Sequence, residues 1–183
     1  MGESISSKTI WDSAAKAGLA LGGISIAYYV VNNLLSATVL GSLLGLLLWI
    51  VKFTACIYLM KFFMVRFAAR NQGVTNNISF KYGVAIALTS AILYSAFYLL
   101  YTTVIFPDLI SDSIGKAMEA YSSALSSSQI DELENMSSKL PTYTFFINLI
   151  YCFLFGTVLS SIFSRNIPPR NPFESPENNI DEQ

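Results

Sequence analysis

Lys52 is the one charged residue within the four longest apolar runs of this 183-residue chain. A lysine at the centre of a membrane-spanning helix costs roughly 2.5–3.5 kcal/mol, so such residues commonly mark a substrate or proton site. The alternative is a lysine whose long side chain reaches toward the lipid headgroups. Uncharged polar side chains that could solvate a buried ammonium are Thr54, Tyr58, Asn148 and Tyr151. We predict a polar intramembrane site of Lys52, Asn148 and Tyr151, and the headgroup alternative stays open.

The remaining chemistry-bearing residues are few. The chain has no histidine, which excludes histidine acid–base catalysis, histidine-activated nucleophiles and histidine-ligated metals. Cys56 and Cys152 lie inside apolar runs, where a free cysteine packs as a small hydrophobe. The acidic residues Asp108, Asp112 and Glu119 do not have the spacing of a known calcium loop, and a solvated helix face is expected. We therefore predict no catalytic, cofactor-binding or metal-binding residue and no enzymatic activity.

The four apolar runs each approach the ~20 residues that an α-helix needs to cross a bilayer core. They span residues 17–35, 39–60, 82–104 and 143–163. Hydrophobic residues make up 53% of the chain and charged residues 13%, against about 25% charged in a typical soluble domain. A soluble fold of this size could not bury so much apolar surface. The fold class expected is all-α, a four-helix transmembrane bundle.

The polar segments around these runs define the expected domain organisation. Residues 1–16 form a cytoplasmic N-terminal segment, residues 17–163 the membrane domain, and residues 164–183 a proline-containing, disordered cytoplasmic tail. The first run follows two lysines, as a signal peptide does, but it is long and carries Asn32 and Asn33 before any cleavage site. We expect it to be retained as a helix.

Small residues at spacings of four indicate where helices approach each other. The first run contains Gly18 and Gly22, and the second contains Gly41 and Gly45. Because only residues 33–38 are available for the turn between these two runs, they form an antiparallel hairpin, and the two glycine pairs predict close packing within it. The third run has a small-residue face that consists of Ala87, Ala91 and Ser95.

Residues 109–140 are too polar to span a membrane, but they carry helical periodicity. A first apolar stripe consists of Ile110, Ile114, Met118, Tyr121 and Leu125. After a break at residues 126–128, a second and shorter stripe consists of Ile130, Leu133, Met136 and Leu140. We expect an amphipathic helical hairpin that lies on the membrane surface or over the bundle, with Pro141 separating it from the last run.

The positions of the basic residues predict the orientation of the bundle. The stretch 61–81 has no acidic residue and four basic ones, which are Lys61, Arg66, Arg70 and Lys81. Residues 105–141 have two lysines against six acidic residues, and the turn at 33–38 has no charge. The positive-inside rule then places both termini and the basic stretch in the cytoplasm, and the amphipathic hairpin outside. The four basic residues are predicted contacts for anionic lipids.

Several stretches together resemble a known family. They are residues 80–84 at the entry of the third run, the tyrosine-rich stretch 98–101, the Pro107-Asp108 exit, the hairpin 114–140 and the end of the last run, 160–166. In this order they resemble the four-pass bacterial inner-membrane family catalogued as domain-of-unknown-function family 4199, over roughly residues 10–166. The resemblance implies four helices, both termini inside and a Gram-negative cytoplasmic membrane. It implies no activity and no catalytic residues.

From these observations we expect a non-enzymatic accessory or scaffolding subunit in the lipid bilayer. It would bind another membrane or periplasmic protein through the outer hairpin or the basic loop. The alternative is a small-molecule or ion transporter or channel that works as a homo-oligomer. Lys52 discriminates between them, because a lysine that lines a polar cavity with Asn148 and tyrosines favours transport, whereas one that faces the lipid headgroups favours scaffolding. The net charge of −1 gives no reason to expect nucleic-acid binding.

Overall fold

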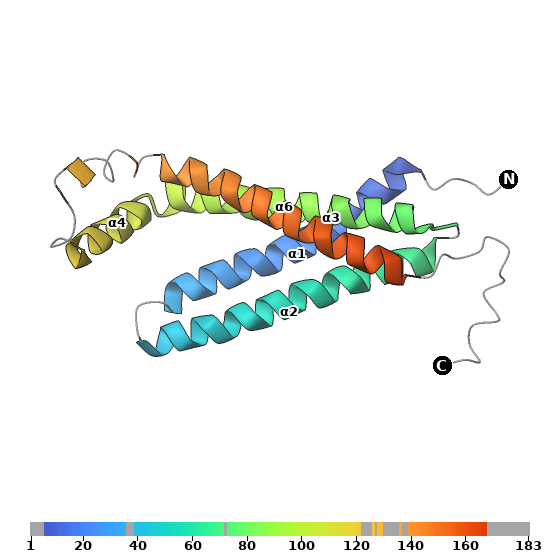
Figure 1. The fold of residues 1–183 in the computed structure, drawn as a ribbon, viewed down its shortest axis with the longest axis horizontal. Coiled ribbons are helices and arrows are strands. Elements are labelled where there is room, and N and C mark those ends of the chain that lie inside the picture. Colours follow the sequence, from blue (N-terminus) through green and yellow to red (C-terminus); the bar gives the residue numbers. More distant parts are fainter. Residues whose placement is uncertain are drawn as a thin grey trace.

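The computed structural model describes residues 6–35, 39–71, 73–121, 126, 128–129, 136 and 139–167. The secondary structure of these residues is entirely helical. The elements are α1 (Ser7–Leu35), α2 (Val39–Arg70), α3 (Asn76–Leu100), the π-helix η1 (Tyr101–Ile105), α4 (Asp108–Ala120) and α6 (Leu140–Asn166) (Figure 1). Of these, α1, α2, α6 and the continuous α3–η1 segment are long and apolar enough to cross a membrane, so the chain is a multi-pass membrane protein, as predicted.

The helices extend beyond the apolar runs. α1 begins at Ser7, so much of the predicted N-terminal segment 1–16 is helical. Ala14 and Ala17 are buried, and this packing extends α1 toward the N-terminus beyond its apolar run. α2 continues to Arg70, and Gly73 follows with a left-handed φ of 77°, which a glycine beyond a helix end commonly adopts.

Both ends of α3 have local causes. The Thr75 side chain caps the start, because its hydroxyl accepts a hydrogen bond from the Ile78 N–H at 3.3 Å. At the other end the helix widens into η1, where the Phe106 N–H donates to the Tyr101 carbonyl at 2.8 Å. Pro107 follows at once, so the chain leaves the bundle there as the sequence predicted.

α6 differs from the prediction at both ends. Pro141 does not precede the helix but occupies its first turn, where a missing N–H breaks no helical hydrogen bond. The helix continues to Asn166, and Ile167 is buried, so the predicted tail boundary at residue 164 is wrong by a few residues. The tail 168–183 and the second apolar stripe at Ile130 and Leu133 lie outside the described residues.

α3 is the centre of the bundle. It packs along α6 on one side and along α1 on the other, while α2 packs mainly on α1 and touches α3 and α6 only sparsely. Figure 1 shows α1 and α2 running side by side, with α6 crossing over α3. The first turn of α1 and the last turn of α6 lie at one end of the bundle, called here the terminal end, and α4 lies at the opposite end, called the α4 end.

Small residues form the contact between α3 and α6. Ala87, Ala91 and Ser95 are buried, which confirms the predicted small-residue face. A Cβ added to Gly156 of α6 would lie 2.5 Å from the Cβ of Ala87, so the two backbones approach closely. One turn further along, the buried Ser160 hydroxyl donates to the Phe80 carbonyl at 2.9 Å.

The glycine pair of α1 faces a different helix from the one predicted. A Cβ on Gly18 would meet Thr89 at 2.6 Å, and a Cβ on Gly22 would meet Leu93 at 2.7 Å, so both glycines pack on α3. The prediction of hairpin packing through this pair is wrong. On α2, Gly45 does face the hairpin partner, because a Cβ there would meet the side chain of Asn32.

Candidate functional site

Lys52 lies well inside its membrane span. Along α2 it is 13 residues after Val39 and 18 before Arg70. At a rise of 1.5 Å per residue, these intervals place it about 20 Å and about 27 Å from the two helix ends. The ammonium is therefore surrounded by the membrane-spanning helices, at a depth where its charge is costly.

Two tyrosine rings hold the Lys52 ammonium. Its Nζ lies 5.4 Å from the ring centroid of Tyr28 on α1 and 5.8 Å from that of Tyr94 on α3. A cation over an aromatic face gains about 2 kcal/mol or more when it is desolvated. Neither ring was among the partners predicted from the sequence, and the predicted Tyr58 is 67% exposed. The two contacts offset much of the cost of the charge.

Lys52 lines a half-open cavity of about 130 Å³ whose wall includes residues of all four spanning helices. Each of α1, α2, α3 and α6 contributes to its wall. The residues that line it are Leu21, Ser25, Trp49, Lys52, Phe53, Cys56, Met60, Ile86, Ala87, Ser90, Tyr151, Cys152, Phe155, Gly156 and Leu159.

The structure brings together part of the predicted polar site. Lys52 and Tyr151 line the same cavity, and Asn148 does not. Asn148 lies one helical turn before Cys152 on α6, toward the α4 end, and is half-buried. The hydropathy pattern could not place it, since the rotation of α6 about its axis is set by the small residues that pack on α3.

An aromatic seam lies between the cavity and the lipid on the side where α2 meets α6. The rings of Trp49 and Phe53 stack at 5.4 Å, and Phe53 contacts Phe155 at 5.2 Å. Phe155 stacks in turn on Tyr151 at 6.3 Å. Of these three ring contacts, the one between Phe53 and Phe155 joins the two helices, which touch only sparsely.

The cavity wall carries one positive charge and no carboxylate. The uncharged polar groups on this wall include the hydroxyls of Ser25 and Ser90 and the thiols of Cys56 and Cys152. Both thiols are close enough to Lys52 to interact with its charge. No described group of three or more histidine, cysteine, aspartate or glutamate residues is placed to hold a metal ion. The chemistry that this wall offers is attraction of an anion.

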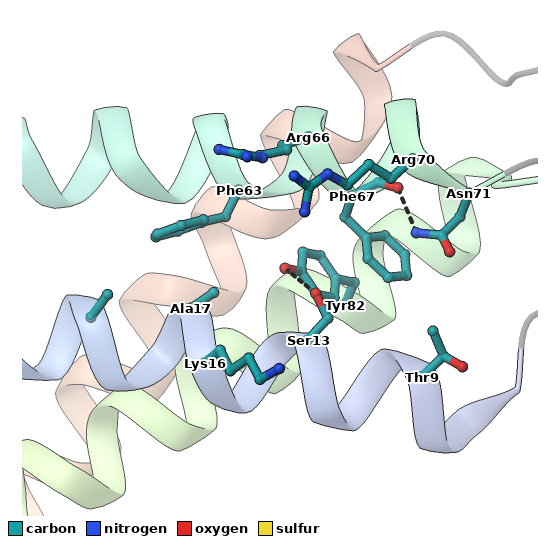
Figure 2. A pocket seen from close by; sticks show the side chains of 11 residues that line it. Thr9, Ser13, Lys16, Ala17, Phe63, Arg66, Phe67, Arg70, Asn71 and Tyr82 are labelled. Carbon is teal, nitrogen blue, oxygen red and sulfur yellow. Dashed lines mark hydrogen bonds between the residues drawn. The ribbon is translucent and has the colours of Figure 1, made fainter.

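The predicted lipid-contacting residues separate into different surfaces at the terminal end. Arg66 and Arg70 line a cavity of about 440 Å³ together with Lys16 (Figure 2). Lys81 lines a different cavity of about 360 Å³ beside Trp11, and Lys61 is exposed on α2 away from both.

The acidic residues Asp108 and Asp112 lie at the α4 end. With Lys116 and Asn33 they line an open pocket of about 490 Å³ between α4 and the end of α1. Both carboxylate-bearing residues are exposed, in agreement with the solvated helix face that the sequence predicted.

The model of one protein family matches residues 16–165, which include most of α1, all of α2, α3, η1 and α4, and α6 up to its penultimate residue. The chain belongs to the family described as "Protein of unknown function (DUF4199)". The resemblance noted in the sequence is thereby confirmed. Neither the curated proteins nor the solved structures include a match to this DUF4199 chain. The family description assigns no activity, so the Lys52 cavity is the best guide to function.

Proposed function

We propose that this DUF4199 protein binds a small monovalent anion at Lys52, without enzymatic chemistry, as the loading site of a membrane transporter. The observation that carries the proposal is the position of the ammonium. It lies inside the membrane span, on the wall of a cavity with no carboxylate to neutralise it. A cation so placed attracts an anion far more strongly than a solvated one does, because the surrounding dielectric constant is low.

The size and charge of the cavity set the ligand class. At about 30 Å³ per water, its volume of about 130 Å³ is that of roughly four water molecules. An anion of the size of acetate or nitrate fits this space, together with a water. One positive charge balances one negative charge, whereas a divalent anion would keep an uncompensated charge away from bulk water.

Passage across the membrane calls for a route to the cavity. Four helices are few for a complete pathway, so we propose that the transporter works as a homo-oligomer.

We further propose that the protein lies in a bacterial cytoplasmic (inner) membrane with both termini in the cytoplasm. The support is the charge distribution. Arg66, Arg70 and Lys81 lie at the terminal end, and the acidic α4 lies at the other. The positive-inside rule assigns the basic end to the cytoplasm.

We expect acetate and nitrate to stabilise the purified protein in a saturable way. Binding to the folded state alone contributes RT ln(1 + [L]/Kd), which is about 2.7 kcal/mol at a hundredfold excess over Kd. Sulfate should act differently, since it stabilises proteins by exclusion from their surface and shows no saturation. The unfolding temperature in detergent, measured over a range of concentrations of each anion, tests this expectation.

Uptake of labelled acetate into proteoliposomes then separates binding from transport. If acetate, nitrate and sulfate all raised the unfolding temperature equally and without saturation, the proposed anion site would be contradicted. Saturable binding without uptake above that of protein-free liposomes would leave a binding protein and remove the transporter.

A second candidate function, scaffolding, has its own observation. The apolar stripe of Ile110, Ile114 and Met118 lies on α4, whose main contact is with η1 at the end of the third span. We propose that this stripe rests against the membrane surface or a partner subunit.

A photo-reactive residue at position 114, compared with one at the exposed Ser111, tests this candidate. We expect crosslinks from position 114 alone. Crosslinks to one protein support a scaffold, crosslinks to lipid alone indicate a surface anchor, and equal yields at the two positions contradict both.

A further inference from the structure

A second cavity, distinct from that of Lys52, lies between α1, α2 and α3 at the terminal end, with a volume of about 440 Å³. Three cations line it: Lys16 on α1, and Arg66 and Arg70 on α2. The lining residues include no aspartate or glutamate. Figure 2 shows Lys16 on one side of the gap between the helices and the two arginines on the other. Like charges from two helices thus surround one opening whose lining has no acidic residue, and Arg66 also lies 5.6 Å from the centroid of the Phe62 ring.

The floor of this cavity is polar and fixed. Tyr82 is 2% exposed, and its ring stacks on Phe67 with centroids 4.0 Å apart and planes 11° apart. Its hydroxyl shares a hydrogen bond of 3.1 Å with the Ser13 hydroxyl (Figure 2). Asn71 donates to the Phe67 carbonyl at 2.8 Å and so ties down the end of α2 that carries Arg70. The cations therefore stand on a scaffold that is already ordered.

The opposite side of the cavity is apolar. Ala17, Ala20 and Phe63 line it, and they lie on the membrane-spanning parts of α1 and α2. A ligand that fills the whole cavity thus meets cations and hydroxyls at one edge and hydrocarbon at the other.

We infer that this cavity is the headgroup site of one anionic phospholipid, whose phosphate is bound by Lys16, Arg66 and Arg70. Arginine guanidinium groups bind phosphate oxygens in pairs, and basic pockets between spanning helices accept anionic headgroups. The apolar wall distinguishes a lipid from free phosphate, because it gives an acyl chain a surface to follow. The inference does not depend on the Lys52 proposal, since the site, the ligand and the end of the bundle are different.

The alternative is diffuse attraction between a basic surface and an anionic leaflet. The chain itself offers the control. Lys61 and Lys81 belong to the same basic stretch and are exposed, but neither lines this cavity. Removing them lowers the net charge by the same amount as removing the two arginines.

Lipid binding by the full chain, measured by native mass spectrometry from detergent with phosphatidylglycerol or phosphatidylcholine, tests the inference. We expect the wild type to retain one phosphatidylglycerol in preference to phosphatidylcholine. The Arg66→Gln/Arg70→Gln variant should weaken phosphatidylglycerol binding about tenfold or more, since each basic residue near the headgroup contributes about 1 kcal/mol. The Lys61→Gln/Lys81→Gln variant should stay within about twofold of the wild type. Lys52→Met should bind the lipid as the wild type does.

Equal losses in the two double variants, or no preference for phosphatidylglycerol, would overturn the inference in favour of diffuse attraction. Competition by millimolar inorganic phosphate would overturn the choice of lipid and leave a soluble phosphate as the ligand. If the glutamine variant fails to fold, Arg66→Lys/Arg70→Lys keeps the charge and loses the paired hydrogen bonds. An intermediate loss of about threefold to fivefold in that variant supports a built phosphate site, and no loss contradicts it.

Discussion

Replacing Lys52 with methionine should abolish the saturable effect of acetate and nitrate on thermal unfolding without destabilising the fold. The substitution removes a charge that costs roughly 2.5–3.5 kcal/mol inside a span. It also removes the contacts with the rings of Tyr28 and Tyr94, which are worth about 2 kcal/mol when desolvated. The difference is a gain of about 0.5–1.5 kcal/mol in stability, so stability and anion binding should change in opposite directions.

Lys61→Met is the matched control for this prediction. The chemical change and the helix are the same, but Lys61 is exposed and lines none of the cavities described above. We expect it to keep the full anion response. A Lys52→Met protein that still saturates with acetate would exclude Lys52 as the anion site. A variant that no longer folds would show that the ammonium is a structural group.

Replacing Gly22 with leucine should separate α1 from α3, whereas the same change at the neighbouring Gly23 should be tolerated. A Cβ on Gly22 would lie 2.7–3.3 Å from three side-chain carbons of Leu93, and one on Gly23 would meet nothing within 4 Å. Overpacking of this kind costs about 1–3 kcal/mol or more, while surface changes stay within about 0.5 kcal/mol.

Unfolding in increasing sodium dodecyl sulfate, followed by circular dichroism, measures both glycine variants on one scale. The two residues are adjacent in one helix, so insertion, helix propensity and added apolar surface are matched. A similar loss in both variants would mean that glycine flexibility, and not close packing on α3, determines the stability of this contact.

The spans were predictable because hydrocarbon tolerates only long apolar helices, and this requirement leaves a plain trace in the sequence. The ends of the helices were harder to predict from the sequence. The buried Ala14 extends α1 to Ser7 through tertiary packing, which no hydropathy average registers. Likewise, the pair Gly18 and Gly22 showed that some helix approaches closely, but the same spacing suits α2 and α3 equally.

The residues around Lys52 likewise divide into those that the sequence could indicate and those that depend on how the helices pack. Lys52 could be singled out because a charge in an apolar run is costly wherever the helices lie, and Tyr151 lines the same cavity although it is 60% exposed. Tyr28 and Tyr94 were missed, because their selection depends on the rotation of α1 and α3. One available signal was overlooked: Gly156, Ser160 and Ser164 recur every four residues, are all buried, and mark the face of α6 that packs on α3.

The uneven packing of α2 has a mechanical consequence. α1, α3 and α6 are joined through small residues at short range, whereas α2 packs mainly along α1, with the stack of Phe67 on Tyr82 joining it to α3 and the contact of Phe53 with Phe155 joining it to α6. Elements with few buried contacts open at the lowest free energy. The helix that moves most easily is therefore α2, which carries Lys52. α1, α3 and α6 can keep their arrangement while α2 moves.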